Sequence, residues 1–460
     1  MLILERVFYL LLAAFIFCIP AFYNGFPLMF PDTAGYIHAG FTSEIGYARV
    51  WLYGGFIRHV SLFESLWLVV FGQGVLLAVS LYLVFKYIAE RQESAKYTLI
   101  YTLIIGITTA AGFHVSMLMP DIFTPIVILN FCLLLFGKNM SKRSTILASL
   151  LFIMATGMHN SHLVLNVGLI LGLTVLMFFK KIRELLYSWG ISIKKLSSLS
   201  ILILCTHLLI CTLHYSKGGE FKATRGSQIF LFARLCDFGI AQSYLKEHCA
   251  TNKVDSLCDN IQTLGLSAQF LWAPNSFLYK TGGWTAKNEA YYRVLVKGIL
   301  TTPKYLKKYI IKSIEATFMQ FFYYEMDPTK ELHATRVDLV QRYFPSYVST
   351  AKNSRQLKRT YTHTVIENQN AIQHVVIMAS LLCILLLLWD GKYSKHQKAV
   401  ALFILVALWG NAFIVAATSG VYDRYQSRVA WLITLPAFWL ICSKLEVLIP
   451  YLSPNRLEKD

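Results

Sequence analysis

Long apolar runs recur along the chain, and short polar segments separate them. A helix needs about 20 apolar residues to cross the roughly 30 Å hydrocarbon core of a bilayer. Several runs are shorter than this, so the pattern leaves their ends and their number open. It predicts an all-α, polytopic bundle of about ten transmembrane helices. The ten runs lie near residues 7–23, 65–88, 97–113, 122–137, 144–157, 163–179, 197–214, 371–389, 399–418 and 429–448.

These runs divide the chain into three parts. Residues 1–214 are expected to form an N-terminal transmembrane bundle of about seven helices, with a first outer loop at residues 24–64. Residues 371–460 are expected to add about three helices and a short tail. The fifth and sixth runs are separated by only four residues, and they could instead form one re-entrant pair.

Residues 215–370 lack long apolar runs, and we expect them to form a mixed, mostly helical extracytoplasmic region. Within this region, residues 303–325 place Lys304, Lys308 and Lys312 at helical spacing beside apolar side chains. The spacing predicts an amphipathic helix. Such a helix would either lie at the membrane surface or present a solvated face.

The composition agrees with a membrane protein. Hydrophobic residues make up 56% of the 460 residues, charged residues make up 15%, and the mean hydropathy is +0.51. A soluble domain carries about 25% charged residues. The formal net charge of +18 would favour nucleic acid in a soluble protein, but here many basic residues separate apolar runs and no nucleic-acid motif is present. We therefore expect membrane lipids, and not nucleic acid, as partners.

The short basic connectors predict the orientation of the bundle. Lysine and arginine concentrate on the cytoplasmic side of membrane proteins, and four connectors are basic: 86–96, 138–143, 180–195 and 392–398. Placing these in the cytoplasm makes both termini cytoplasmic. The first run lacks a small-residue cleavage site and is expected to be a retained helix. These features favour a multi-pass protein of a bacterial-type inner (plasma) membrane whose active face is periplasmic or extracellular.

Three cysteines lie in the outer region: Cys236, Cys249 and Cys258. Cys249 and Cys258 are close enough in sequence to form a local disulfide in an oxidising compartment. Cys236 is left over or competes for this pairing.

The outer ends of the helices carry the polar residues that are candidates for chemistry, because charged groups near the bilayer are costly. The first group is Asp32 and Tyr36, four residues apart, so that one helix turn would place both on one face. The alternative for Asp32 is a helix cap. The same outer side carries Arg49, His114, Asp121, His159, His162, Asp423 and Arg424.

Each of these residues has a structural explanation as well. A histidine at the membrane edge is often a satisfied polar group, Asp121 follows a proline and could cap a helix, and Asp423 with Arg424 could be a local ion pair. What favours function is the topology, which puts all of these residues on one side of the membrane.

The pattern of an acidic residue with a tyrosine four residues on, then Arg49 and Tyr53, resembles the GT-C glycosyltransferases that use polyprenyl-phosphate-linked sugars. The layout, with Asp121 at the next outer turn, is similar to protein O-mannosyltransferases and aminoarabinose transferases. The resemblance covers roughly the first 140 residues. This chain has Asp32-Thr33 where many relatives carry paired acidic residues, which leaves metal dependence open.

The resemblance implies a site in which Asp32 is the general base and Asp121 is a second acid or a metal ligand. It implies a polyprenyl-phosphate-linked sugar donor and a cell-envelope glycan, lipid or protein as acceptor. A divalent cation is the cofactor that it admits. Arg49 and Arg424 are candidates for the donor phosphate, because guanidinium groups suit bidentate contact with phosphate. Residues expected to line the substrate site are Tyr36, His38, Tyr53, His114, His159, His162 and Asp423.

Other chemistries and functions were weighed against this one. The chain has no zinc-binding histidine or cysteine pattern, nucleophile elbow, phosphate loop or dinucleotide fingerprint. The first alternative function is a transporter or flippase for a lipid-linked or anionic substrate, but transporters place polar residues near the midplane in repeated halves. The second is a non-glycosyl envelope transferase with an essential histidine. The third is a scaffold without chemistry.

Overall fold

The computed structural model describes residues 2–42, 44–47, 49–251, 257–330, 337–389 and 393–448. In these ranges the regular elements are helices, and one isolated β-bridge joins Leu28 to Met117. The predicted all-α class is confirmed for this part of the chain. The first bundle contains α1 (Leu2–Phe17), α2 (Ile19–Asn24), α3 (Thr33–Phe41), α4 (Trp51–Val60), α5 (Leu66–Tyr87), α6 (Ser94–Thr108), α7 (Ala111–Ser116), η1 (Pro120–Ile122), α8 (Phe123–Phe136), α9 (Lys142–Gly157), α10 (Asn160–Met177), α11 (Lys180–Ser188) and α12 (Ile193–Gly218).

The remainder of the chain is also helical. The middle of the chain forms α13 (Ser227–Asp237), α14 (Ile240–Thr251), η2 (Cys258–Thr263), α15 (Ser267–Trp272), α16 (Phe277–Lys280), α17 (Ala286–Thr301), α18 (Pro303–Phe322), α19 (Val337–Tyr343), η4 (Pro345–Tyr347) and α20 (Val348–Lys352). The last bundle contains α21 (His363–Trp389), α22 (Lys395–Thr418), α23 (Asp423–Ala430), η5 (Trp431–Ile433) and α24 (Thr434–Leu448).

Five of the described helices are long and apolar enough to cross a membrane: α5, α10, α12, α21 and α22. Their length and composition indicate a membrane-embedded protein. Helices at the other predicted runs are shorter. For example, α1 has 16 residues, α6 has 15 and α9 has 16, and a shorter apolar helix covers Pro120–Phe136. The count of ten spans therefore stays a prediction.

The helices pack around two hydrophobic cores. The larger core joins residues of both bundles, and it includes Phe321, Tyr361 and Ile366 from the segment between them. The smaller core is built from α13 to α18, with Phe232, Tyr292 and neighbouring side chains at its centre. The segment 215–370 is thus divided: its first part has a core of its own, and its last part packs on the membrane bundle.

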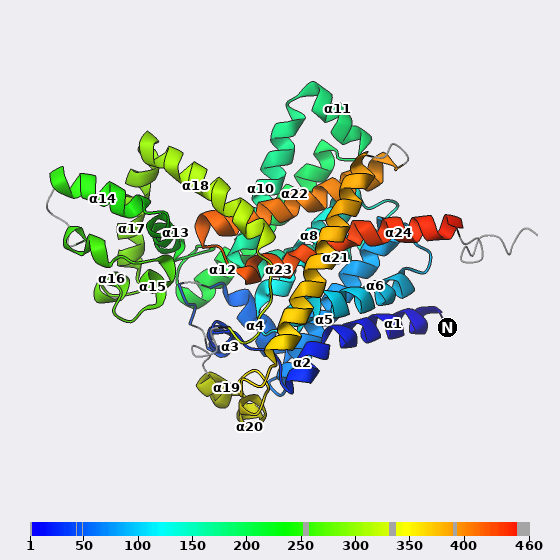
Figure 1. The fold of residues 1–460 in the computed structure, drawn as a ribbon, viewed down its shortest axis with the longest axis horizontal. Helices are drawn as coiled ribbons and strands as arrows, with labels where there is room; N and C mark the ends of the chain where they lie inside the picture. The colour runs from blue at the N-terminus through cyan, green and yellow to red at the C-terminus, as the bar shows by residue number, and fades with distance from the viewer. Residues whose placement is uncertain are drawn as a thin grey trace, which may run out of the picture.

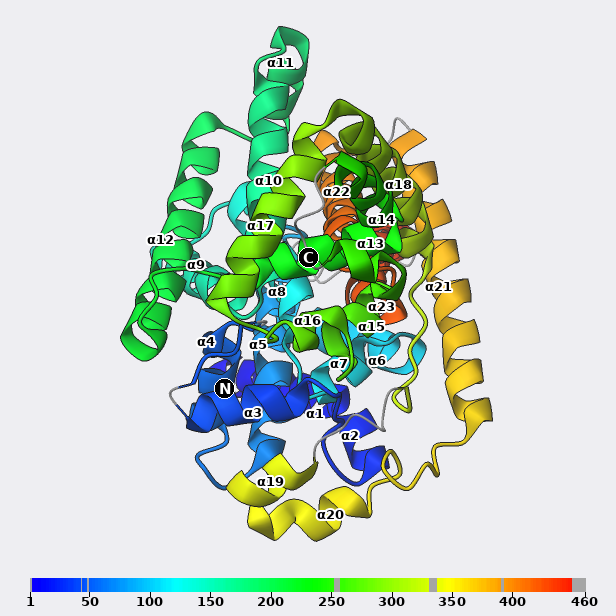
Figure 2. The same cartoon turned by 90° about the vertical axis from the view of Figure 1, so that its left-hand side faces the viewer.

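The helices of the smaller core lie at one end of the molecule. In Figure 1 the helices α13 to α17 gather at one end, and α1, α6 and α24 extend toward the other end, where the N-terminus lies. Figure 2 shows α19 and α20 beneath α3, on the opposite side of the molecule from α11. The first outer loop is therefore enclosed by helices that come from distant parts of the sequence.

Two glycines let α3 and α4 cross closely. A Cβ atom on Gly40 would lie 2.2 Å from the backbone oxygen of Gly54, and one on Gly54 would lie 2.7 Å from the backbone of Gly40. Only glycine permits this approach. The crossing fixes the first outer loop as a helical hairpin and so positions the polar residues on α3.

A later segment holds the chain just before α3. The side chain of Gln356 accepts a hydrogen bond from the backbone N–H of Met29 (2.9 Å) and donates one to the Met29 carbonyl (2.8 Å). The side chain of Asn24 accepts from the backbone N–H of Gln356 (2.8 Å). These groups are buried, so each bond satisfies a polar atom that water does not reach.

The smaller core carries a disulfide. Cys249 on α14 is bonded to Cys258 at the start of η2, with Cα atoms 5.7 Å apart. This is the pairing that the sequence spacing favours. Cys236 is a buried free thiol within the same core, and the other candidate pairing is not formed.

Candidate functional site

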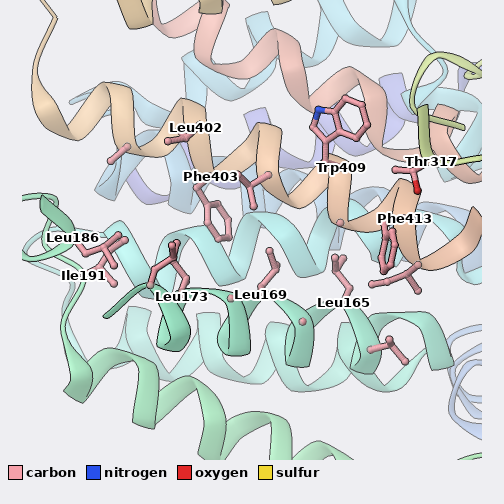
Figure 3. A pocket seen from close by; sticks show the side chains of 18 of the residues that line it. Leu165, Leu169, Leu173, Leu186, Ile191, Thr317, Leu402, Phe403, Trp409 and Phe413 are labelled. Carbon is pink, nitrogen blue, oxygen red and sulfur yellow. The ribbon is translucent and has the colours of Figure 1, made fainter. Parts of the chain in front are cut away.

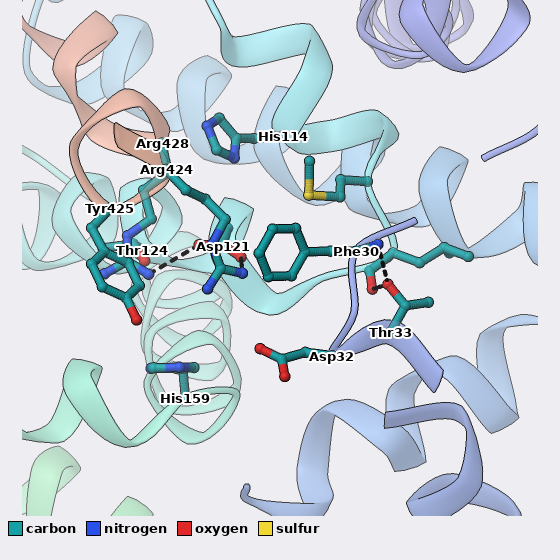
Figure 4. A network of polar contacts seen from close by, with 12 residues as sticks. Phe30, Asp32, Thr33, His114, Asp121, Thr124, His159, Arg424, Tyr425 and Arg428 are labelled. Atoms are coloured by element: carbon teal, nitrogen blue, oxygen red, sulfur yellow. Dashed lines mark hydrogen bonds and ion pairs between the residues drawn. The ribbon is translucent and has the colours of Figure 1, made fainter. Parts of the chain in front are cut away.

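A buried ion triad lies where η1 meets α23. Asp121 follows Pro120 in η1, and its carboxylate accepts hydrogen bonds from Arg428 (3.1 Å) and Arg424 (3.3 Å). Figure 4 shows both arginines reaching toward Asp121 from the same helix. Because the carboxylate faces these arginines, it does not cap a helix. Two guanidinium groups around one carboxylate favour its charged form.

The spacing on α23 explains how one short helix supplies this set. Arg424, Ser427 and Arg428 are separated by three and four residues and therefore share a face. Arg428 also donates to Oδ1 of Asn411 on α22 (3.0 Å), and the Ser427 hydroxyl lies 2.9 Å from Nε2 of His114 on α7. The triad is thus held to α22 by Asn411, and the helix that carries its arginines is held to α7 by Ser427.

A second ion pair lies at the start of α3. Asp32 precedes α3, but its side chain makes no capping hydrogen bond and instead pairs with Arg49. Gly35 lies one turn later on the same face, where a Cβ atom would be 2.8 Å from the Arg49 guanidinium. The guanidinium also lies 5.6 Å from the centre of the Tyr36 ring. Glycine at position 35 therefore leaves the space that this pair occupies.

The two groups form one electrostatic unit, which we call the arginine-aspartate cluster: Asp32, Arg49, Asp121, Arg424 and Arg428. The charge of Arg424 interacts with that of Asp32, and the charge of Arg49 interacts with that of Arg424. Phe30 lies between the groups, with the Arg424 guanidinium 4.0 Å from its ring centre. In Figure 4, Asp121 lies to the left of the Phe30 ring and Asp32 lies below it.

One part of the cluster is buried, and the other part is accessible to solvent. The side chains of Arg428 and Asp121 are 1% and 3% exposed, whereas those of Arg424, Arg49 and Asp32 are 17%, 24% and 30% exposed. Three guanidinium groups face two carboxylates, so the cluster carries one excess positive charge. A partly desolvated site with this balance favours an anionic ligand, and guanidinium groups match phosphate in shape and charge.

Four predicted residues have other partners. His38 contacts the hydroxyl of Tyr343 (2.8 Å) and Glu44 (3.3 Å), on a different face of α3 from Asp32. Tyr53 is fully buried and donates to Gln73 (2.7 Å), with its ring against that of Tyr36. It therefore supports the site from behind and does not line it.

The remaining two are His162 and Asp423. His162 is buried and is bonded through Nε2 to Thr124 (2.8 Å) and through Nδ1 to the Ala155 carbonyl (2.7 Å), as a satisfied structural histidine. Asp423 pairs with Lys330, not with the side chain of Arg424. The expected local ion pair between neighbours is therefore not formed, because each side chain has a partner elsewhere in the fold.

His159 lies beside the cluster and precedes α10. Its Nδ1 accepts from the backbone N–H of Ser161 (3.2 Å), which makes it the cap of that helix. Burial, together with the nearby charge of Arg428, lowers the pKa of His159 to about 4. The imidazole is therefore neutral near pH 7. Figure 4 places it on the same side of Asp121 as Asp32.

This histidine is expected to make stability depend on pH. Its pKa in the folded state is below the unfolded value of about 6.5, so the unfolded chain binds the proton more tightly and stability falls as pH drops from 6.5 toward 4. Protonation also turns Nδ1 into a donor and removes the cap. We expect the His159 contribution to fall by about 1–2 kcal/mol between pH 7 and pH 5.

The measurement is the unfolding free energy of wild type and of His159→Asn at both pH values. Asparagine keeps a capping side chain without titrating, so the variant should lose less stability on acidification. An equal loss in both proteins would contradict the prediction.

One further residue, Arg428, belongs to the site. It follows Arg424 at helical spacing, which is the only signal of its role in the sequence. Lys330 pairs with Asp423 outside the cluster, and no signal in the sequence indicates this contact. Among the described residues, no group of three or more histidine, cysteine, aspartate or glutamate side chains could hold a metal ion.

An apolar groove with a volume of about 830 Å³ lies between α10, α18 and α22 (Figure 3). Its lining follows α10 from Val164 to Leu176, a length of about 18 Å. Asn411, the partner of Arg428, lies on α22 among residues that line the groove. The groove and the cluster therefore share α22, and α10 leads from His159 into the groove.

Comparison with protein-family models, curated proteins and solved structures finds no match to this chain.

Proposed function

We propose that the protein is a membrane glycosyltransferase that transfers a sugar from a polyprenyl-phosphate carrier to an acceptor of the cell envelope. The observation that carries the proposal is the arginine-aspartate cluster, where an accessible carboxylate lies beside two accessible guanidinium groups and the site has excess positive charge. The donor phosphate is an anion, and the acceptor hydroxyl or amine needs a base.

The step assigns a task to each accessible side chain. The acceptor oxygen or nitrogen attacks the anomeric carbon of the sugar, and the bond between that carbon and the phosphate oxygen breaks. The acceptor proton passes to the Asp32 carboxylate, and the bond electrons leave with the lipid phosphate. Arg49 and Arg424 stabilise the charge of the departing phosphate. Because phosphate competes for Arg49, donor binding weakens the hold of Arg49 on Asp32 and leaves the carboxylate available as base.

The buried part of the cluster holds the accessible part in place. Asp121 fixes Arg424 through one oxygen, and it is itself fixed by Arg428 and thereby by Asn411. A guanidinium group positioned in advance costs little reorganisation when charge develops on the phosphate. In this proposal Asp121 is a positioning residue, and the reaction has no step that depends on a divalent cation.

The proposal includes the finer topology. Ten membrane segments with both termini in the cytoplasm would put the cluster on the periplasmic or extracellular side, where polyprenyl-linked sugars are used. The basic connectors support this orientation. The protein would then be a multi-pass protein of a bacterial-type inner membrane.

The apolar groove supports a lipid-linked donor. It is lined almost entirely by apolar side chains and shares α22 with the cluster (Figure 3). A hydrocarbon chain gains about 0.8 kcal/mol for each CH₂ that it buries. A polyprenyl chain in the groove with its phosphate at the cluster would use both features.

The test compares the envelope glycans and lipids of cells that lack the protein with those of complemented cells, by mass spectrometry. We expect the acceptor to lose the mass of one sugar, and the carrier lipid that still bears its sugar to accumulate. The purified protein in liposomes should then transfer radiolabelled sugar and release polyprenyl phosphate. Movement of the carrier between leaflets without release of polyprenyl phosphate would reject the proposal in favour of a transporter or flippase.

Filling the groove is expected to weaken donor binding. Gly168 and Gly172 lie one turn apart on α10, and a Cβ atom on either meets nothing within 4 Å. Replacing both with leucine should therefore fill the groove without a backbone clash. We expect KM for a long-chain donor to rise about tenfold or more, since several CH₂ groups lose their contact, with KM for a short-chain donor unchanged.

The matched control is Leu204→Phe, which adds bulk at an exposed apolar position of α12 outside the groove. KM for the long-chain donor should stay at the wild-type value in this variant. An equal change for long and short donors in the glycine variant would contradict the role of the groove.

A further inference from the structure

The C-terminal end of α18 carries no charge. After the last charged residue, Glu315, the helix continues for seven residues with no charge. A helix in bulk solvent has no reason to separate its charges in this way, whereas a helix that enters a bilayer obliquely does. The charged residues are Lys304, Lys307, Lys308, Lys312 and Glu315.

One face of α18 packs along the candidate membrane span α22. The Tyr309 hydroxyl donates to the carbonyl of Ala417, at the outer end of α22 (3.2 Å), and the Phe321 ring stacks on Trp409 with centres 4.2 Å apart. Eight residues separate Ala417 from Trp409, which is about 12 Å of helix. From Tyr309 to Phe321, α18 thus follows the candidate membrane span α22 inward from its end.

The face of α18 opposite this contact carries exposed apolar side chains from Ile310 onward. Ile310, Ile311, Ile314, Phe318 and Met319 are 46–66% exposed. Neighbouring positions on α22, such as Val406 and Phe413, are also apolar and half exposed. The two helices therefore present one continuous apolar surface, of the kind that soluble proteins avoid.

The lysines lie at the other end of α18. Lys304 pairs with Glu247 and Lys312 pairs with Glu315, whereas Lys307 and Lys308 form no ion pair within the described residues. Lys307 is exposed and Lys308 is half buried. Because they precede Tyr309, they lie near the level of the outer end of α22, where headgroup phosphates are found.

We propose that α18 is an interfacial membrane helix: its uncharged C-terminal end and its exposed apolar face lie in the acyl layer of the outer leaflet, and Lys307 and Lys308 bind the phosphate groups of anionic phospholipids. The surface fits a lipid bilayer because it combines an apolar face with free ammonium groups at one end. The helix ties the smaller core, which contains Tyr305, to the membrane. The placement of α18 in lipid does not require the transfer reaction, but this surface borders the apolar groove, because four of its side chains also line the groove: Ile314, Phe318, Val406 and Phe413.

The first test places a photo-crosslinking amino acid at Met319, 66% exposed on α18, or at Val294, 71% exposed on α17. Each full-length variant is reconstituted in nanodiscs of equal parts phosphatidylglycerol and phosphatidylcholine, irradiated and analysed by mass spectrometry. We expect phospholipid adducts at position 319 and at least tenfold fewer, on the order of background, at position 294. Equal yields at both positions would overturn the placement of α18 in the bilayer.

The second test replaces Lys307 and Lys308 with glutamine and measures how much phosphatidylglycerol is enriched over phosphatidylcholine among the lipids that stay bound after a detergent wash. One lysine near an anionic surface contributes a factor of about five in binding, so the enrichment should fall about fivefold or more. The control replaces Lys246 and Lys287, which are exposed elsewhere, and should keep the enrichment. An unchanged ratio in the first variant would overturn the phosphate contact.

Discussion

Asp32→Asn is expected to lower the rate of sugar transfer by about 10²- to 10⁴-fold, which is the usual contribution of a general base. Asparagine keeps the size of the side chain but cannot accept the acceptor proton. The measurement is kcat for transfer from a polyprenyl-phosphate-linked sugar by the purified protein in liposomes. Since the Asp32 and Arg49 side chains are 30% and 24% exposed, we expect the loss of their ion pair to change stability by less than about 1 kcal/mol.

The matched control is Glu44→Gln, which removes a carboxylate from the same outer loop. Glu44 is 82% exposed and contacts His38 away from the cluster, so transfer should keep its wild-type rate. Asp32→Glu keeps a carboxylate at a shifted position and should retain part of the activity. Full activity of Asp32→Asn would reject the base role and favour a transporter or a transferase that depends on a histidine.

Asp121→Asn is expected to lower the free energy of unfolding by about 3–5 kcal/mol, because it leaves buried guanidinium charge without a counterion. Arg428 is 1% exposed and Arg424 is 17% exposed. The measurement is equilibrium or thermal unfolding in a fixed lipid or detergent. The surviving folded fraction should also bind the donor phosphate less tightly, because Arg424 is no longer held in place.

The control is Asp423→Asn. Its partner Lys330 is 44% exposed, so this substitution should lower the free energy of unfolding by less than about 1 kcal/mol. A double-mutant cycle adds Arg428→Gln to Asp121→Asn. The second change removes the unpaired charge, so the double variant should be more stable than the sum of the single effects predicts, by about 0.5–3 kcal/mol. Additive losses would show that the two side chains do not interact as the geometry requires.

The polar candidate residues show which contacts could be predicted from residue spacing and which could not. Asp32 and Tyr36 were predicted to share a face because a helix turn is a local property, and the structure adds Arg49 to that face. The structural alternative for Asp423 and Arg424 was a local ion pair between neighbours, whereas the fold gives each a partner 93 and 303 residues away in the chain. Residue spacing carries no information about such contacts.

His162 and Tyr53 show the opposite case. Both belonged to the polar set on the outer side, and both are buried with their hydrogen bonds satisfied by Thr124, Ala155 or Gln73. A polar residue near a helix end either makes a structural hydrogen bond or lines the functional site. The choice depends on which neighbours the packing brings within about 3 Å.

The sequence by itself determined that the described chain is helical and membrane-embedded. A segment in lipid must satisfy its own backbone hydrogen bonds, so a long apolar segment predicts a helix from its local composition alone. It also indicated the Cys249 to Cys258 pairing, which needs only short-range proximity. Only the tertiary structure decided that Arg428 would neutralise Asp121 across 307 residues and that the segment 215–370 would divide between two cores. Those outcomes depend on packing between distant helices, and no local pattern encodes it.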